Sequence, residues 1–513
     1  MAMITPAATD LANLDADALR QLLQDSWAER QALEDKILFK DTKIAQLTHE
    51  ITALRRYQFG KKGEQLSGVQ GSLLEEAVCA DIAAIEVELE QLTETTSSKP
   101  KQQPKRKPLP ESLPRIEFRH EPQNTACRCG CQLQRIGEDI SEKLDYVPGV
   151  ASVERHIRRK WVCRNCETLI QAPVPAHVID KGLATTGLLA YVLVAKYLDH
   201  LPLYRLEQIF DRAGISLSRS TLAQWVGVCG VQLQPLVDAL RQAILAHRVV
   251  HADETPVQVL KPGSKSTHRA YLWVYAPGAF EDLKAVVYDF TEGRAGEHAR
   301  TFLGDWHDSL VCDDYSGYKA CFTQGMTEIG CMAHARRKFF DLHASSKSPL
   351  AEQALQYIGQ PYEVERQVED LDPDDRRQIR LEKAKPLVDA LRAWMQAQRT
   401  RVPDGSATAK AFDYSLKRWV ALTRYLDDGQ LPIDNNHIEQ RIRPIALGRA
   451  NWLFAGSLRA GKRAAPVMTL VQSAKLNGHD PYAYLKDVLT RLPTQPASRI
   501  DQLLPHNWQP QTP

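Results

Sequence analysis

The stretch RVVHADETPVQV (residues 248–259) marks the point where the chain changes from helical to strand-like periodicity. Two similar stretches follow, HRAYLWVYA (268–276) and KAVVYDF (284–290). A helical GEHARTFL (296–303) and a fourth strand in SLVCDD (309–314) come next. Three successive strands, a helix and a further strand are the opening of a ribonuclease-H-like mixed sheet.

We therefore predict an α+β multidomain protein whose catalytic core, a ribonuclease-H-like mixed α/β fold, spans 248–456. A helical insertion from about 345 to 428 interrupts this core, and a C-terminal helical segment covers 457–513. Upstream, 174–247 reads as a helical domain. Within it RLEQIFDRAGISLSRSTLAQWVGVC resembles a helix-turn-helix, in which Gly214 ends the first helix and Ser218 or Ser220 caps the second. Ordinary helical hairpins have the same layout.

The first 173 residues divide at a Pro-rich, basic linker, 97–114, that is nearly free of core residues. Before it, 1–65 is helical and carries heptad-spaced apolar residues, which predicts a coiled coil or hairpin for self-association; an amphipathic helix packed on its own chain is the alternative. One heptad position of 1–65 is occupied by Ile37, Ile44 and Ile51 and the other by Leu33, Leu47 and Leu54. After the linker, 115–173 holds five of the ten cysteines.

Composition sets the broad class of protein. The 513 residues are 43% hydrophobic and 25% charged, which is an ordinary soluble balance. No long apolar run or signal-peptide pattern is present, so we expect a cytoplasmic protein that has no membrane partner. The net charge of +2 hides an uneven distribution, because 440–479 contains several Lys and Arg residues and no Asp or Glu. Such a segment suits a polyanion, although a solvated basic face has the same composition.

Two acidic positions follow apolar strands, where a charge needs a reason. Side chains alternate across a strand, so His251, Asp253 and Thr255 share one face and Glu254 points to the other. Asp253 is one candidate metal ligand, and an ordinary turn at the end of the strand is the alternative. Asp313 and Asp314 follow the fourth strand and also point to opposite faces; spacing does not choose between them.

The third acidic position lies on a predicted helix that begins near Pro432, where Asp434 or Asn435 can cap the first free amides. Ile438, Ile442 and Ile445 form its inward stripe. Glu439 lies on a neighbouring face, four residues before Arg443. The two form either a surface ion pair or a carboxylate ligand beside a phosphate-binding arginine. Phosphoryl transfer on DNA uses two divalent ions about 4 Å apart, which carboxylates hold.

Several blocks together resemble the insertion sequence 66 family of bacterial transposases, specifically its large catalytic protein. The resemblance runs over nearly the whole chain, from LRRYQFGKKGEQL to MTLVQSAKLNGHDPYAYLKDVL, and its most specific block is DNNHIEQRIRPIALGRANWLFAGS. HADETPV, CDDYSGY and GCMAHARRKFF are similar to further blocks of the family.

The resemblance implies a metal-dependent DDE transposase. Its carboxylates would be Asp253, Asp313 in preference to Asp314, and Glu439, holding two Mg²⁺ or Mn²⁺ ions. It implies cleavage at element ends followed by transfer of the freed 3′-hydroxyl into target DNA. Arg336 and Arg337 would clamp backbone phosphates and His334 would contact the scissile phosphate or be a structural histidine. We expect DNA partners, a homo-oligomer, two smaller proteins of the same element, and a bacterial, nucleoid-associated location.

The cysteines predict a structural zinc ribbon, with reduced thiols as the alternative. Cys163 and Cys166 have zinc-knuckle spacing, and the second pair comes from Cys127, Cys129 and Cys131. The family pattern places a ligand at Cys129, but Ala126 stands where its partner belongs. Cys331 and His334 have a spacing that suits zinc, without an evident second pair nearby. The basic side chains of the ribbon that we expect to face phosphate are Arg155, Arg158, Arg159 and Lys160.

Two other functions share most of these features. A DNA-binding regulator of the element with an inactive ribonuclease-H-like core would keep the DNA-binding modules without using the carboxylates. A nuclease would cleave without joining strands. The presence of all three acids disfavours the regulator, and the modules suited to pairing two DNA ends disfavour the nuclease.

Overall fold

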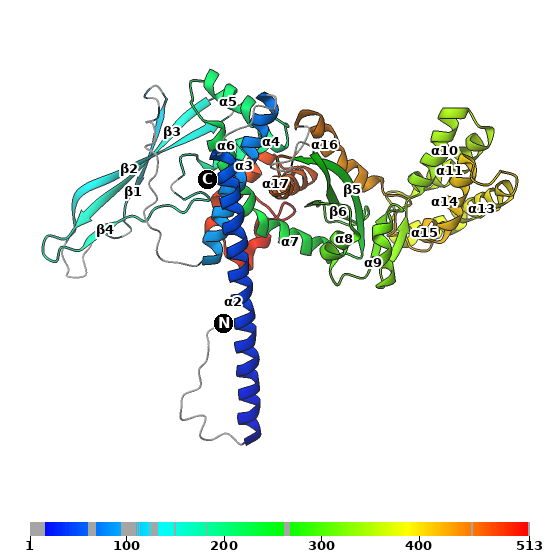
Figure 1. The fold of residues 1–513 in the computed structure, drawn as a ribbon, viewed down its shortest axis with the longest axis horizontal. Coiled ribbons are helices and arrows are strands. Elements are labelled where there is room, and N and C mark those ends of the chain that lie inside the picture. Colours follow the sequence, from blue (N-terminus) through cyan, green and yellow to red (C-terminus); the bar gives the residue numbers. More distant parts are fainter. Residues whose placement is uncertain are drawn as a thin grey trace.

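The computed structural model describes residues 16–59, 68–93, 109, 111, 113–122, 124, 132–147, 150–180, 182–260, 267–452 and 455–510. Cys127, Cys129 and Cys131 lie outside this range, as does most of the 97–114 linker. The chain forms an elongated arrangement, with a small sheet at one end, a helical lobe at the other and a central sheet between them (Figure 1).

The central sheet contains the strands and the helix that the sequence predicts, in the predicted order. Its strand order is β7-β6-β5-β8-β9, in which β5, β6 and β7 are antiparallel and β5, β8 and β9 are parallel. The last strand, β9, is an addition to the prediction. The bounds are β5 Val249–Leu260, β6 Thr267–Pro277, β7 Val287–Thr291, α8 Gly296–Leu303, β8 Ser309–Cys312 and β9 Thr327–Gly330.

Helices cover both faces of this sheet, because its strands are apolar on both sides. Helices α16 (Asn436–Trp452) and α17 (Leu458–Leu476) pack on one face, where Ile438 and Ile445 are buried. Helix α7 (Gln234–Leu245) lies against the other face. The approach of α17 is close: a Cβ at Gly461 would lie 2.2 Å from the Phe290 ring, so only glycine fits there. The sheet is therefore a rigid base for side chains at its strand ends.

A helical lobe follows β9 and has a core of its own around Phe339, Ile358, Leu391 and Phe412. Buried Arg380 ties the lobe together by donating to three backbone carbonyls and pairing with Glu365. The bounds are α10 Met332–Ser346, α11 Pro349–Val368, α12 Pro373–Ile379, η2 Arg380–Ala384, α13 Lys385–Arg399, α14 Ala407–Lys417, α15 Trp419–Thr423 and η3 Arg424–Leu426.

The helix-turn-helix candidate forms the predicted helices, α5 (Leu203–Arg212) and α6 (Arg219–Gln232), after α4 (Thr186–Tyr197). Gly214 has a positive φ of 75° and the Ser218 hydroxyl accepts from Thr221 N, as the turn requires. However, α6 packs against α3, α4 and α17, and half of its residues are buried. The buried part of α6 is therefore covered by other helices of the chain.

The N-terminal helices α2 (Ala16–Phe59) and α3 (Gly68–Thr93) form a hairpin that packs on α6. Only the C-terminal part of α2 touches α3, through Leu47, Ile51 and Leu54, and the rest projects from the body (Figure 1). Acidic residues of the hairpin neutralise part of the basic 440–479 segment. Arg459 pairs with Glu50 and Glu88, and Arg463 pairs with Asp81. These two arginines are thus engaged by carboxylates within the chain.

The remaining elements are a small sheet and the C-terminal helices. Strand β3 pairs with β1 in parallel and with β2 and β4 antiparallel. No helix among the described residues has the length and apolar character needed to cross a membrane. The bounds are β1 Arg115–His120, β2 Gln134–Val147, β3 Val150–Val162, β4 Leu169–Gln171, α9 Lys319–Thr323, α18 Pro481–Arg491, η1 Ser316–Tyr318, η4 Leu492–Thr494 and η5 Ala497–Leu503.

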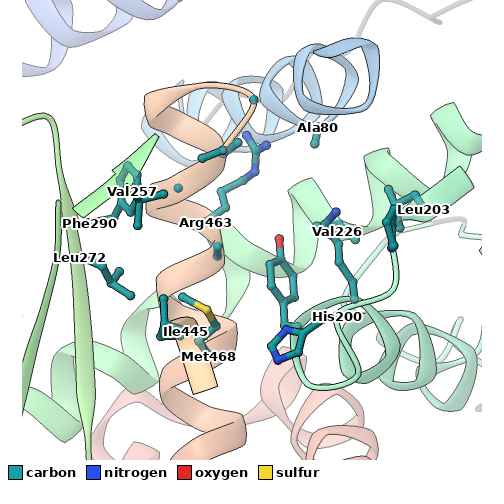
Figure 2. Close-up of a pocket in the computed structure, with 18 of the residues that line it drawn as sticks. Ala80, His200, Leu203, Val226, Val257, Leu272, Phe290, Ile445, Arg463 and Met468 are labelled. Carbon is teal, nitrogen blue, oxygen red and sulfur yellow. The ribbon is translucent and has the colours of Figure 1, made fainter. Parts of the chain in front are cut away.

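A mainly apolar cavity of about 120 Å³ lies where the hairpin, the helical domain and the central sheet meet (Figure 2). Ala80 of α3, Val226 of α6, Phe290 of β7 and Met468 of α17 contribute to its wall. The buried Arg463 side chain points toward its edge and is neutralised by Asp81. The cavity thus belongs to the packing between three parts of the chain.

Candidate active site

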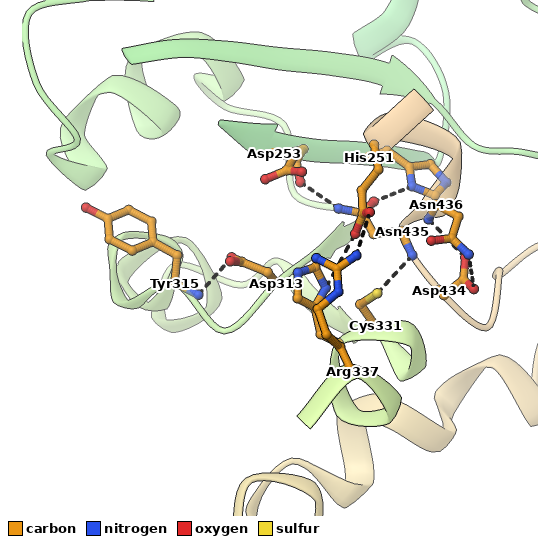
Figure 3. A network of polar contacts seen from close by, with 12 residues as sticks. His251, Asp253, Asp313, Tyr315, Cys331, Arg337, Asp434, Asn435 and Asn436 are labelled. Carbon is orange, nitrogen blue, oxygen red and sulfur yellow. Dashed lines mark hydrogen bonds and ion pairs between the residues drawn. The ribbon is translucent and has the colours of Figure 1, made fainter. Parts of the chain in front are cut away.

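The predicted aspartates meet at one edge of the central sheet. The β5–β8 ladder ends at the rung that pairs His251 with Val311, and Asp253 and Asp313 each lie two residues beyond it. Parallel strands carry such residues to the same end of a sheet, so the two carboxyl groups point into one space (Figure 3). Strand β5 continues to Leu260 beside β6, which means that Asp253 lies within a strand and not at its end as predicted.

Alternation on β5 separates the neighbouring acids as the sequence predicts. Glu254 accepts hydrogen bonds from Arg294 Nε at 2.6 Å and from the Tyr318 hydroxyl at 2.9 Å, on the face opposite Asp253. The Arg294 guanidinium also lies over the Tyr315 ring, 3.8 Å from its centroid. Glu254 is therefore a buried, neutralised support for the loop after β8.

The structure distinguishes Asp313 from Asp314, which the strand pattern alone does not. Asp313 Oδ1 accepts from Tyr315 N at 2.9 Å, which orients its carboxylate toward Asp253. Asp314 points to the helical lobe, where its Oδ1 lies 3.5 Å from Arg418 Nε. Its charge is thus engaged by a buried arginine, and Asp313 is the acid that faces the candidate site.

Glu439 lies in the first turn of α16, where the predicted helix begins. It pairs with residues of α10: its Oε1 is 3.8 Å from His334 Nδ1 and its Oε2 is 3.6 Å from Arg337. Its partner is thus not Arg443, which is exposed one turn further along α16. Asn435, which the sequence offers as a helix cap, is buried and instead bonds to His251. Asp434 accepts from Asn436 N.

The electrostatics show that the three acids share one environment. Burial and then the negative charges of Glu254, Asp313 and Glu439 raise the pKa of the Asp253 carboxyl to about 8. A carboxyl group in this setting favours its neutral form unless a cation binds beside it. The cluster therefore has the donor chemistry that suits a hard divalent cation.

A second donor group overlaps the first at Glu439. The donor atoms of Cys331, His334 and Glu439 all lie within 4.8 Å of one another. Among the residues that the structure describes, the donor atoms of Asp253, Asp313 and Glu439 are not grouped this closely. Glu439 is thus the third donor that the sequence did not reveal for Cys331 and His334. In this structure the Glu439 carboxylate lies close to α10. Burial raises the pKa of the Cys331 thiol to about 12, and Asn435 N donates to its sulfur at 3.2 Å.

The other predicted phosphate-binding residues have diverse surroundings. Arg336 and Arg337 are exposed on α10 beside the site. In the small sheet the basic side chains are held within the sheet itself. Arg159 pairs with Glu121 at 2.7 Å, Lys160 pairs with Asp139 at 2.6 Å, and Arg158 donates to Ala172 O. Arg155 lies 3.7 Å from both Glu117 and Glu142.

The described half of the cysteine cluster forms a tight turn between β3 and β4. Cys163 is buried, and its backbone bonds to Thr168 O and Glu167 N close the turn. Cys166 is exposed, with its sulfur 3.1 Å from the Thr168 hydroxyl. The turn carries two thiols that are separated by two residues, which is the spacing of a zinc knuckle.

Comparison with known proteins identifies the family. Residues 181–463 match the model described as "Transposase IS66 family", and 469–506 match "IS66 C-terminal element". Residues 46–118 match "Transposase C of IS166 homeodomain" and 124–167 match "zinc-finger binding domain of transposase IS66". The chain belongs to the IS66 family of transposases, which confirms the resemblance found in the sequence.

Curated relatives occur in Sinorhizobium fredii (strain NBRC 101917 / NGR234). "Uncharacterized protein y4qI" is 37% identical, covering 99% of both chains. "Uncharacterized protein y4jD" is 36% identical over 91% of this chain and 95% of its own, and "Uncharacterized protein y4hP" is 34% identical over 91% and 89%. The similarity thus extends over about nine tenths or more of each protein and supports one shared architecture.

Proposed function

We propose that this transposase is a DDE enzyme that cleaves DNA at insertion-sequence ends and joins them to target DNA. The observation that carries the proposal is the position of Asp253 and Asp313 beyond the same rung of β5 and β8, with Glu439 close enough to raise the pKa of Asp253. We interpret the sheet as a ribonuclease-H-like core with a helical insertion, on the basis of its strand order. We also propose the domain boundaries that the sequence predicts.

Asp253, Asp313 and Glu439 would hold two Mg²⁺ or Mn²⁺ ions. Bound ions of this kind lower the pKa of an attacking water and stabilise the leaving oxygen in an in-line displacement. The chain contributes the rest. The Tyr315 amide orients Asp313, the buried Asn435 aligns β5 with α16, and Arg337 beside Glu439 places positive charge where a backbone phosphate would lie. His334 is a further contact for that phosphate.

The zinc-finger segment supports a structural role for Zn²⁺. We propose that Cys163 and Cys166 bind it together with two of Cys127, Cys129 and Cys131. A tetrahedral thiolate site would stabilise the tip of the small sheet. This module would grip the element ends, using Arg155, Arg158, Arg159 and Lys160 after exchange of their present ion pairs for phosphate.

The decisive experiment mixes the protein with labelled candidate ends, plasmid target and Mg²⁺, and assays nicked and joined products. The wild type should produce both, whereas Asp253→Ala, Asp313→Ala and Glu439→Ala should bind ends without cutting them. Exposed Gln440→Ala on the same helix is the matched control. Binding without cleavage by the wild type would favour the regulator, and cleavage without joining would favour the nuclease. A negative result is repeated with the two smaller proteins of the element present.

A further inference from the structure

A polar cavity of about 580 Å³ opens beside the candidate active site, between α10 and α11. It falls within the range of roughly 300–1,000 Å³ that is typical of sites for small organic groups. The start of α16 closes one side, so the cavity borders the helix that carries Glu439. The side chains that matter for its chemistry are Arg336, Arg337, Phe340, Tyr362, Arg366 and Asn436.

The cavity has a positive lining. Arg336 and Arg337 come from α10 and Arg366 from α11, against a single carboxylate, Glu363, which pairs with Arg366. The side chains of Arg337 and Arg366 are 63% and 62% exposed, so both guanidinium groups can reach a ligand from solvent. A polyanion is therefore the favoured occupant.

Phe340 adds an aromatic surface to this positive lining. It is 50% exposed, whereas Met332, Ala335 and Phe339 of the same helix are buried. Arg336 and Arg337 precede it by four and three residues and so share its side of α10. Guanidinium groups beside an exposed ring are the combination that holds single-stranded nucleic acid, because the ring stacks on a base while the cations hold phosphates.

The cavity is coupled to the carboxylates by direct contacts. Arg337 lines the cavity and lies 3.6 Å from Glu439. Tyr362 forms part of the wall and donates from its hydroxyl to Asp434 Oδ2 at 2.8 Å, while Asp434 Oδ1 accepts from Asn436 N. The wall is thereby fixed to the first turn of α16. A DNA strand whose phosphate lies at the carboxylates would place a neighbouring nucleotide at this cavity.

We propose that the cavity receives one unpaired nucleotide of the DNA strand, adjacent to the scissile phosphate, with its base stacked on Phe340. Arg336 and Arg366 hold the flanking phosphates. The proposal rests on the proposed transposase function, because it needs a DNA end bound at Glu439. Taking a base out of the duplex costs stacking energy, which the aromatic and ionic contacts of the cavity offset.

The first test follows the base directly. Ends carrying 2-aminopurine at single positions around the cleaved bond are bound to the Asp253→Asn protein, which keeps the cavity and does not cut. One position should change its fluorescence, and the change should be lost in Asp253→Asn/Phe340→Ala. Val420→Ala, which removes an exposed apolar side chain elsewhere in the lobe, is the matched control. Binding of the ends without a Phe340-dependent position would overturn the proposal.

The second test uses cleavage by otherwise wild-type protein. Phe340→Ala should slow the cutting of intact ends between about fivefold and a hundredfold, the equivalent of one lost base stack. Phe340→Trp should retain most of the rate. An abasic residue at the identified position should bring Phe340→Ala back to the wild-type rate, which a merely misfolded variant would not achieve. Equal cutting of intact ends by Phe340→Ala and wild type would sink the proposal, whereas a wild type that cuts no end would instead contradict the proposed function.

Discussion

His251 Nδ1 lies 2.6 Å from Asn435 Oδ1, and both side chains are completely buried. Asn435 also donates from Nδ2 to Ala252 O at 3.0 Å and from its backbone N to Cys331 Sγ at 3.2 Å. One side chain and one amide thus connect β5, the start of α10 and the start of α16. These are the elements that carry Asp253, His334 and Glu439, so Asn435 is a positioning residue for the proposed site.

Removing the Asn435 side chain should damage both stability and activity. Asn435→Ala removes the hydrogen bonds that Asn435 makes to His251 Nδ1 and Ala252 O, and each buried polar group left unsatisfied costs about 1–3 kcal/mol. Urea unfolding should show this loss in the free energy of unfolding. Cleavage should fall by about 10–100-fold, as when an outer partner of a metal ligand is lost. Gln440→Ala, one turn away and exposed, should change neither quantity; a stable and fully active Asn435→Ala would contradict the positioning role.

Asp313 and Asp314 should respond differently to loss of charge. Asp313→Asn should reduce cleavage by more than the roughly 100-fold that an outer-shell change costs, because it removes a proposed metal ligand. Asp314→Asn should retain most activity, since Asp314 faces Arg418 and not Asp253. Single-turnover cleavage in Mg²⁺ measures both. The opposite ranking would assign the ligand to Asp314.

Local patterns predicted much of this site. Strand alternation placed Asp253 and Glu254 on opposite faces of β5, and the helical stripe placed Ile438 and Ile445 in the core, as the structure has them. Predictions that depend on contacts with residues far away in the sequence were incomplete. The sequence offers Asp434 or Asn435 as a helix cap. Asp434 accepts from Asn436 N, but the Asn435 side chain bonds to His251 across 184 residues, and no local signal reports such a contact.

Burial by distant partners also explains the other differences. The basic 440–479 segment suggested an open surface, but Asp81 of α3 reaches Arg463 across 382 residues. The second helix of the predicted helix-turn-helix is covered by α3 for the same reason: a Cβ at Gly227 would lie 2.4 Å from Ala80 O. Hydrophobic periodicity predicts which face of a helix is buried, but it does not predict which segment of the chain packs against that face.

The Asp81–Arg463 pair should be a main anchor of the N-terminal hairpin. The two side chains are 2% and 6% exposed, and breaking a buried pair by removing one partner costs about 3–5 kcal/mol. Asp81→Ala should therefore free the hairpin and expose it to limited proteolysis. Replacing both residues by apolar ones, as in Asp81→Leu/Arg463→Met, should recover much of the loss. Arg55→Ala, which breaks an exposed pair with Glu86, should cost less than about 1 kcal/mol.

Acid should destabilise the small sheet through His156. Burial, followed by the positive charges of Lys143, His120 and His177, lowers the pKa of His156 to about 4, below its ordinary value of 6.5. A base with a depressed folded-state pKa contributes stability above pH 6.5, and this contribution is lost as the pH falls toward 4. Trp161 fluorescence should report a falling unfolding midpoint across that window. The pH slope should flatten in His156→Gln; an unchanged slope would assign the acid response to other groups.

The projecting part of α2 should mediate the proposed self-association. Leu33 and Ile37 are 54% and 57% exposed, whereas Leu47 and Ile51 of the same heptad pattern are buried against α3. A second copy of α2 would cover the exposed part as a coiled coil, because its apolar spacing continues there without a partner among the residues that the structure describes. Leu33→Lys/Ile37→Lys should shift the protein to a smaller species in sedimentation velocity, with the thermal unfolding of the body unchanged. Lysines at exposed Thr42 and Thr52, off the seam, should leave the assembly intact, and a wild type that sediments as a monomer at micromolar concentration would refute this role for α2.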